Sequence, residues 1–373
     1  MTPKKAYIWS YGAVSCFGVG VPVLIQNIFE GNNGLRPLTR FPTNGLYPAL
    51  GGEVAGWELW IPEKKTSSWA FLWAKLAIQE CLDRCSPSLP RSLPLIVSTT
   101  LGNMENLGDS CLSYGQLAQE IAKHFSFSGP VYTLNTACSS SLNALAFGWE
   151  LLEHQPQFSQ VLIVGVDALS SFVLAGFSSL KALTSGWVRP FSKNRDGLLV
   201  SEGAGAILMS LHPGNEALCL KGYGNASDAN HLTGPHPQGE GLVRAIEAGL
   251  KMAHLSPNQI HYINAHGTGT PYNDRMETIA FHRVFGKEAT QIPISSSKSM
   301  IGHALGAAGA LESIICLEAL KQQRVPPTIH YDPDLECDLD YVPEKTRPLF
   351  LQYCLKTASG FGGQNSALIL EKE

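Results

Sequence analysis

The chain has 373 residues, of which 44% are hydrophobic, 16% are charged and 36 are glycine. This is enough for one large or two ordinary domains with a substantial core, and it excludes a disordered or fibrous protein. The formal net charge of −4 argues against a broad nucleic-acid-binding face.

The first residues lack the features of a signal peptide, because their apolar run is broken by Ser and Gly. No uninterrupted apolar run is long enough for a membrane span. The nine cysteines are scattered, and Cys81 and Cys85 have no second Cys or His pair near them. We therefore expect reduced thiols in the cytoplasm and no zinc site.

Several short apolar runs are typical of buried strands, and helical patterns lie between them. In chain order the sequence predicts a helix over 66–83, a strand over 94–99, a helix over 140–153, strands over 160–168 and 205–211, a helix over 241–253, strands over 261–267 and 292–297, a helix over 305–321 and a strand over 366–372. Strands that alternate with helices indicate α/β layers.

A weak internal repeat is visible when the chain is shifted by 161 residues. Segment 131–152, VYTLNTACSSSLNALAFGWELL, then lies over 292–313, IPISSSKSMIGHALGAAGALES. Both are typical of a strand, a small polar turn and an alanine-rich helix. The same shift places AILM over ALIL. Two coincidences at one offset indicate two similar halves, with a site where they meet.

Cys138 lies at the predicted junction between the strand and the alanine-rich helix of the first half. The positive end of a helix dipole favours a thiolate, and this would make the cysteine a nucleophile. Free cysteines are also common as small buried hydrophobic residues. Position alone therefore favours packing over chemistry.

His266 lies where a predicted strand ends in a loop of small residues. Thr268 and Thr270 offer hydroxyl donors in this loop, and Asp274 and Glu277 share one face of the helix that follows. The alternative is a loop histidine beside a solvated, acidic helix start.

Lys298 and His303 lie around the start of the corresponding helix in the second half. A lysine among apolar and small residues needs a partner, such as Asp274 or Glu277. The alternative is a surface lysine and a histidine at a helix start. The glycines that flank Phe361 free backbone N–H groups to point at an oxygen.

Together these segments supply a nucleophile, two histidines, a lysine and an oxyanion donor. This combination suits carbon–carbon bond formation on a thioester. The sequence contains no P-loop, GxGxxG or GxSxG motif, so it gives no support to nucleotide binding or to a serine hydrolase.

The motifs NTACSSSLNAL, NAHGTGTPYND..E, K....GHALGAAGALE and SGFGG occur in this order, and GAVSCFGVG, GLRPLTRF, RDG....EGAG and SDANHLTGPHPQGEG extend the match over essentially the whole chain. With these motifs the sequence resembles the elongating, Cys-His-His type of β-ketoacyl-acyl carrier protein synthase, in the thiolase superfamily. The resemblance implies an α/β, thiolase-like fold. Its two similar βαβαβαββ halves, 1–211 and 212–373, would pack as a five-layer α-β-α-β-α sandwich.

The resemblance also implies an acyltransferase, a 3-oxoacyl-acyl carrier protein synthase that needs no metal or redox cofactor. Cys138 would take an acyl chain from an acyl carrier protein. His266 and His303 would stabilise the enolate that forms when malonyl-acyl carrier protein loses CO2, and Lys298 would orient them. The N–H groups of Cys138 and Phe361 would hold the oxyanion, and Phe361 would gate the acyl pocket.

In the same way, Asp274 and Glu277 would form a supporting network that neutralises the lysine. Thr268 and Thr270 would contact the phosphopantetheine arm of the carrier protein. The expected partners are an acyl carrier protein and a second copy of the chain, with the strand before the cysteine near the two-fold axis. A heterodimer with a chain length factor also fits.

Two departures from the family bear on the substrate. The segment between Thr99 and Cys138, which normally helps to line the acyl tunnel and the dimer contact, is shorter than in ordinary fatty-acid synthases. Ser359 stands where those enzymes often carry a second phenylalanine. SGFGG is more similar to polyketide and aryl-polyene ketosynthases, which favours a polyketide or polyene pathway over fatty-acid synthesis.

Two alternatives remain within the same fold. A chain-length-factor-like subunit would not condense, but such proteins usually lack the active cysteine. Thiolases and initiating synthases use other arrangements, and His303 as the third member argues against both.

Overall fold

The structure is a computed structural model that describes residues 5–43, 45–46, 48–60, 68–85, 89–103, 113–214 and 216–373. The strands are β1 (Ala6–Ser15), β2 (Gly18–Val19), β3 (Arg36–Pro37), β4 (Leu50–Gly51), β5 (Leu95–Ser98), β6 (Val131–Leu134), β7 (Gln160–Asp167), β8 (Gly203–Ser210), β9 (Leu218–Ser227), β10 (Tyr262–Asn264), β11 (Ile294–Ser295), β12 (Arg324–Val325), β13 (Arg347–Pro348), β14 (Tyr353–Gly360) and β15 (Gln364–Lys372). The helices are α1 (Val21–Glu30), α2 (Trp69–Asp83), α3 (Tyr114–Phe125), α4 (Ser140–His154), α5 (Ser171–Ser179), α6 (Glu240–Ala253), α7 (Pro271–Phe285), α8 (Lys298–Ile301), α9 (Ala308–Gln322) and the short 3-10 helix η5 (Leu305–Ala307).

The main sheet has the same strand pattern when it is followed inward from either end. Its order is β11-β10-β14-β15-β9-β1-β8-β7-β5-β6, with β2 paired to β1. At each end three parallel strands are followed by two antiparallel ones. The pairs Ala6–Leu220 and Tyr7–Cys219 join β1 to β9, so the two halves form one continuous sheet. This junction was not predicted.

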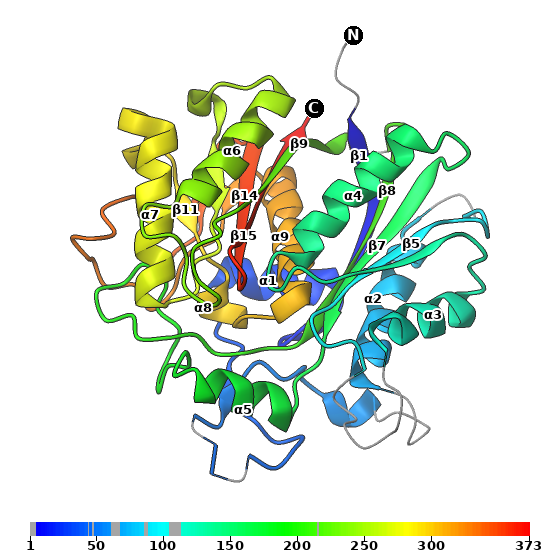
Figure 1. Cartoon of the computed structure of the whole chain (residues 1–373), viewed down its shortest axis with the longest axis horizontal. Coiled ribbons are helices and arrows are strands. Elements are labelled where there is room, and N and C mark those ends of the chain that lie inside the picture. The colour runs from blue at the N-terminus through cyan, green and yellow to red at the C-terminus, as the bar shows by residue number, and fades with distance from the viewer. Residues whose placement is uncertain are drawn as a thin grey trace.

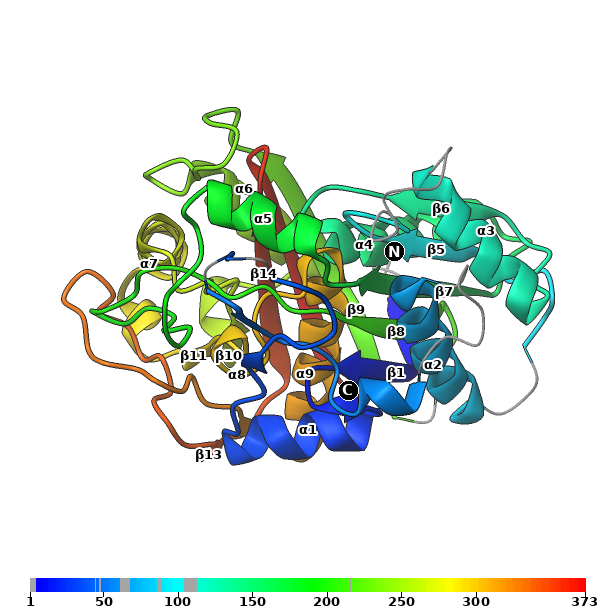
Figure 2. The same cartoon turned by 90° about the horizontal axis from the view of Figure 1, so that it is seen from below.

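The helices form layers on both sides of the two sheet halves (Figure 1). Helices α4 and α9 lie between the halves and contact each other, with α4 against β7 and α9 against β8 and β14. Helices α2 and α3 cover the outer side of one half, and α6 and α7 cover that of the other. The predicted five-layer arrangement is therefore confirmed. In the view from below, α5 lies near the line where the halves meet (Figure 2).

Small residues let the two central helices approach the sheet closely. A Cβ atom at Gly165 of β7 would lie 2.2 Å from Ser141 Oγ of α4, and one at Gly205 of β8 would lie 2.8 Å from Ala310 Cβ of α9. Helix α9 is buried from Ala308 to Leu320. The alanine-rich pattern thus marks a helix that is enclosed on all sides.

Most predicted elements have the right type, but their ends near the site differ. The strand predicted over 292–297 is shorter, Ile294–Ser295, and α8 begins soon after it at Lys298. Helix α9 begins at Ala308 rather than at 305, since Leu305 has a φ of 52° and cannot continue a regular helix.

The predicted boundary at residue 211 falls in the connection between β8 and β9. Part of the shortened segment after Thr99, residues 104–112, lies outside the described residues. Among the described helices, none has the length and apolar character needed to cross a membrane.

Candidate active site

Cys138 lies in the turn between β6 and α4, near the positive end of a 15-residue helix, and its side chain is buried. Ala137 has a φ of 53°, so the chain turns sharply just before the cysteine. The hydroxyl of Ser139 donates to the carbonyl of Thr136 at 2.8 Å, and that of Ser140 donates to the carbonyl of Ala137 at 2.5 Å. The serines therefore stabilise the turn that presents the cysteine.

Burial raises the pKa of the Cys138 thiol to about 11, although the charge of Lys298 and the backbone N–H groups of Phe361 and Cys138 lower it. Desolvation is therefore the largest influence on the resting thiol, and it opposes the thiolate that the start of a helix favours. The thiol is neutral at neutral pH. The lysine charge and the two N–H groups remain available for negative charge that develops during a reaction.

Two histidines reach the cysteine from the second half. His266 follows β10, and His303 lies between α8 and η5. The N–H of His303 donates to the carbonyl of Leu199 at 2.8 Å, and its carbonyl accepts from the N–H of Ser201 at 2.9 Å, so the first half anchors it. Cys138 Sγ and one nitrogen of each imidazole lie within 4.8 Å of one another. The imidazole centroids are 5.2 Å apart, with the rings at 84°.

The hydrogen bonding of His303 identifies its tautomer. Nδ1 accepts from the N–H of Leu305 at 3.2 Å, so a neutral ring carries its proton on Nε2. Nε2 is buried and has no hydrogen-bond partner within the described part of the chain. Burial, helped by the charges of Lys298 and Lys356, holds the pKa of both His266 and His303 well below the usual value. The site therefore presents neutral imidazoles.

Lys298 is fully buried at the start of α8, and its ammonium group forms an ion pair with Glu312 of α9. The predicted pairing with Asp274 or Glu277 is wrong. The other carboxylate oxygen of Glu312 lies 2.8 Å from Nζ of Lys356, a second fully buried lysine. The sequence alone assigns no role to Glu312 or Lys356, because only the packing of α8 and α9 against β14 brings these groups together.

Asp274 and Glu277 instead hold the loop after β10. Glu277 accepts from the N–H groups of His266 at 2.7 Å and Gly267 at 2.6 Å. Asp274 accepts from the N–H of Thr268 at 3.1 Å. Burial raises the pKa of both carboxyl groups, and that of Asp274 to about 7. The two residues thus form a supporting network for the backbone of this loop, and the charge of Glu277 also acts on Lys298 without an ion pair.

A cavity of about 430 Å³ leads to Cys138 and both imidazoles. Thr268 and Thr270 line it, and their hydroxyls share a hydrogen bond of 2.8 Å. Phe361 also lines it and stacks on Phe177 of α5, with ring centroids 6.0 Å apart. The aromatic pair thus forms part of the wall of the cavity that reaches Cys138 and the two imidazoles.

Asp167, which is not among the residues predicted from the sequence, connects the first half to the loop after His303. Its buried carboxylate accepts from Thr99 Oγ1 at 2.7 Å, from the N–H of Thr100 at 3.0 Å and from the N–H of Gly306 at 2.6 Å. The one feature of the sequence that could have pointed to Asp167 is its position as the acidic residue that ends the apolar run QVLIVGVD.

Cys138, His266 and His303 have side chains that bind transition metals, and their ligand atoms converge. The positive charge of Lys298 acts on the thiol and on both rings. This charge opposes a bound cation and favours an anionic species.

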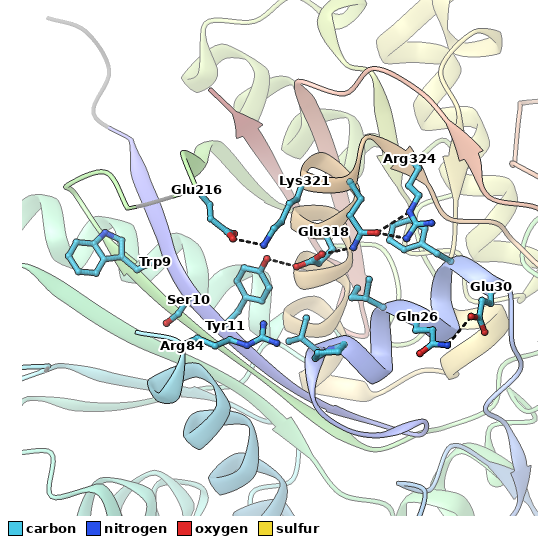
Figure 3. A pocket seen from close by; sticks show the side chains of 15 residues that line it. Trp9, Ser10, Tyr11, Gln26, Glu30, Arg84, Glu216, Glu318, Lys321 and Arg324 are labelled. Atoms are coloured by element: carbon cyan, nitrogen blue, oxygen red, sulfur yellow. Dashed lines mark hydrogen bonds and ion pairs between the residues drawn. The ribbon is translucent and has the colours of Figure 1, made fainter. Parts of the chain in front are cut away.

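A larger cavity, of about 740 Å³, lies between β1, α1 and the end of α9 and shares no lining residue with the first (Figure 3). The hydroxyl of Tyr11 donates to Glu318 at 2.7 Å, and Lys321 forms an ion pair with Glu216. These polar groups already have partners, and nothing among them resembles a reactive site.

The layered fold and the converging Cys-His-His group define a condensing, acyl-transferring enzyme with a thiolase-like architecture. Residues 101–212 match the family model "Beta-ketoacyl synthase, N-terminal domain", and residues 218–332 match "Beta-ketoacyl synthase, C-terminal domain". The chain belongs to the β-ketoacyl synthase family.

Two curated relatives illustrate its neighbours in sequence. A putative polyketide beta-ketoacyl synthase 1 from Streptomyces cyaneus is 32% identical, with 98% of each chain covered. A 3-oxoacyl-[acyl-carrier-protein] synthase 2 from Synechocystis sp. is also 32% identical, covering 99% of this chain and 98% of the relative.

Solved structures match over the whole chain. The ishigamide ketosynthase/chain length factor has a TM-score of 0.92 at 28% identity, with both chains fully covered. A ketosynthase (ApeO) in complex with its chain length factor (ApeC) from Xenorhabdus doucetiae has a TM-score of 0.86 at 29% identity, covering 99% of this chain and 98% of the other.

Proposed function

We propose that this chain is a 3-oxoacyl-acyl carrier protein synthase that condenses an acyl chain on Cys138 with malonyl-acyl carrier protein. The observation that carries the proposal is a buried cysteine whose sulfur lies within 4.8 Å of two imidazole nitrogens. Both rings are kept neutral by burial and by lysine charge, which lowers their pKa. Such rings can donate hydrogen bonds without carrying charge.

In the first half-reaction the Cys138 sulfur attacks the thioester carbonyl of the acyl carrier protein. The new carbon–sulfur bond forms, the bond to phosphopantetheine breaks, and the cysteine proton leaves with the carrier thiol. The N–H groups of Cys138 and Phe361, which lower the pKa of the thiol, supply the oxyanion donors. Thr268 and Thr270 hold the phosphopantetheine arm in the cavity that they line.

In the second half-reaction malonyl-acyl carrier protein loses CO2 and becomes an enolate. His266 and the free Nε2–H of His303 donate to its oxygen. The carbanion attacks the acyl thioester, and the Cys138 sulfur leaves and regains a proton. Lys298 orients the site and contributes positive charge. No metal or redox group takes part in these steps, so exhaustive dialysis against a chelator should leave the rate unchanged.

The test is to supply acyl- and malonyl-acyl carrier proteins and to measure the 3-oxoacyl product. Cys138→Ala should abolish the product and the acyl adduct seen by intact mass. Cys85→Ala, which changes a thiol in a different cavity, is the matched control. The proposal fails if Cys138→Ala condenses as well as the wild type. Absence of any acyl adduct on the wild type would favour the non-condensing, chain-length-factor-like alternative.

The pathway is proposed to be polyketide or polyene synthesis rather than fatty-acid synthesis. Ser359, a small residue, lines the cavity beside Phe361, and its hydroxyl donates to Asn365 Oδ1 at 2.7 Å. A small side chain there leaves room that a second phenylalanine would fill. Mass spectrometry of Cys138 after exposure to a panel of acyl-carrier proteins tests this, and selective loading of short saturated chains would contradict it.

A two-fold dimer through β6 is proposed. β6 ends the strand order, and its four residues are all half-buried. The equivalent strand of the other half, β11, is buried, and the N–H of Ile294 donates to the carbonyl of Asp340 at 2.7 Å. Among the strands that the structure describes, the open edge of the main sheet is therefore β6, which suits pairing with another chain. Sedimentation of the purified chain tests a homodimer, and co-purification from the native host tests a heterodimer with a chain length factor.

A cytoplasmic location is proposed, because a carrier-protein-dependent enzyme must meet its acyl carrier protein. Eight of the nine cysteines lie within the described residues and are in the reduced form, which suits a reducing compartment. Fractionation of the host cell tests the location.

A further inference from the structure

Lys356 lies in the middle of β14 and is fully buried. Its Nζ contacts three backbone carbonyls, those of Thr357 at 2.7 Å, Ala265 at 3.2 Å and Asn264 at 3.4 Å. The last two residues immediately precede His266. Burying an ammonium group costs free energy. A lysine buried directly behind a histidine of the site is therefore expected to have a role there.

Glu312 carries one lysine on each carboxylate oxygen, Lys298 on Oε1 and Lys356 on Oε2. A pair of Lys298 and Glu312 would already be neutral by itself. Lys356 therefore adds a positive charge beyond what this pair needs, and it does so next to the imidazoles rather than at the surface.

The charged and titratable groups that face Lys356 come from every element packed around it. They are Glu312 on α9, Lys298 on α8, Glu277 on α7, the Cys354 thiol on β14, and the imidazoles of His266 and His303. Glu277 is the other carboxylate of this group.

The strand also supports His266 from its other side. The hydroxyl of Thr357 donates to Glu277 Oε1 at 3.0 Å, and the same oxygen accepts from the N–H of His266 at 2.7 Å. Lys356 and Thr357 are consecutive, so one contacts the carbonyls before His266 and the other contacts the carboxylate that holds its N–H. β14 thus fixes the chain on both sides of this residue.

We propose that Lys356 is a positioning residue of the condensing site, which clamps the chain before His266 and places a second positive charge behind the two imidazoles. This inference rests on the proposed function for its catalytic consequence. One consequence is that both imidazoles stay neutral before a negatively charged substrate group arrives. The other is that the positive charge of Lys356 already favours the enolate when it forms. In support, Lys356 is among the groups that lower the pKa of both histidines, after burial and Lys298.

The test compares two substitutions that separate charge from hydrogen bonding. Lys356→Met removes both, whereas Lys356→Gln removes the charge and keeps a donor for the carbonyls. Lys221→Met is the matched control, because Lys221 also shares one carboxylate, that of Glu371, with a second lysine, Lys5. The histidine side chains are titrated by NMR, with assignments from His266→Gln and His303→Gln.

In both Lys356 variants, His266 and His303 should become protonated at a pH about one unit higher than in the wild type. A shift of this order is expected when one nearby full charge is removed. Lys221→Met should not shift either ring. The acid limb of the pH profile of kcat should move in the same direction, with KM for malonyl-acyl carrier protein nearly unchanged. Lys356→Met should lose more activity than Lys356→Gln, because only the latter retains the clamp.

Unchanged histidine titrations in both Lys356 variants would overturn the inference. The failure of both variants to fold would also overturn it. The Lys298–Glu312 pair that remains in these variants is neutral, so such a failure would mean that Lys356 has a purely structural role. The NMR result is independent of turnover. A wild-type chain that fails to condense would refute the proposed function while the titrations still decide the role of Lys356.

Discussion

Glu312→Gln should destabilise the fold strongly, because Glu312 is the counter-ion of two fully buried lysines. Its exposed fraction is 1%, and those of Lys298 and Lys356 are 0%. Removing one partner of a buried ion pair costs about 3–5 kcal/mol. We expect the upper end of this range, since two ammonium groups lose their partner.

The assay is urea unfolding followed by fluorescence. With an m-value of about 3 kcal/mol/M, a loss of about 5 kcal/mol moves the midpoint by about 1.7 M. Glu318→Gln is the matched control on the same buried helix. Glu318 accepts from the neutral groups of Tyr11 at 2.7 Å and Gln322 at 2.7 Å, so its substitution should cost only about 1 kcal/mol.

The pH dependence gives a second check on the same variant. Burial already lowers the pKa of Lys298 in the folded chain, and replacing Glu312 removes the charge that raises it, so the unfolded chain binds more protons below about pH 10. The stability of Glu312→Gln should therefore rise relative to the wild type as the pH increases from about 7 to 10. A deficit no larger than that of Glu318→Gln, or one that does not shrink with pH, would refute the assignment of Glu312 as the counter-ion.

Three further predictions concern the reactive groups. Alkylation of Cys138 by iodoacetamide should accelerate about tenfold per pH unit from roughly pH 7 to 10, because its thiol pKa is raised to about 11. The free energy of unfolding should fall as the pH drops below about 6.5, because histidines in the unfolded chain bind protons there whereas His266 and His303 stay neutral in the folded chain. In urea titrations, His303→Asn should make the free energy of unfolding depend less steeply on pH. Gly360→Ala should lower the condensation rate by about tenfold or more, since its Cβ would lie 3.2 Å from the Cys138 nitrogen. At Gly176 no described atom beyond its own stretch of helix lies within 4 Å of an added Cβ, so Gly176→Ala should leave the rate unchanged and stabilise α5 by about 0.5–1 kcal/mol.

Each of these predictions has an outcome that contradicts it. Alkylation whose rate is flat above about pH 8 would mean that the thiol titrates lower than its burial implies. An unaltered acid slope in His303→Asn would show that this ring is not a neutral buried group. Equal rates for Gly360→Ala and Gly176→Ala would show that the backbone near Phe361 does not constrain the cysteine.

The sequence by itself determined the layers and most of the elements. The runs that form β7 and β8 are continuous and apolar, because both faces of these strands are covered by helices, and their ends were predicted within two residues. The repeat at 161 residues matches the first residues of β8 and β15, Gly203 and Gln364. These features depend on local pattern and on burial of both faces, which the order of residues encodes directly.

The sequence also marked the segments that form the site, through motifs around Cys138, His266 and His303. The roles of the individual residues stay predictions until the variants are measured. What the motifs contained was the residue types and their order along the chain, and this sufficed to identify the family.

Only the tertiary structure decided the charges at this site. Lys298 pairs with Glu312 rather than with Glu277, and a second lysine, Lys356, shares that carboxylate. The pKa of the Cys138 thiol is raised because desolvation outweighs the charge of Lys298 and the backbone N–H groups that lower it. Ion pairing and desolvation depend on which groups distant in sequence are buried together. No local pattern specifies that, so it emerges only when α8, α9 and β14 pack.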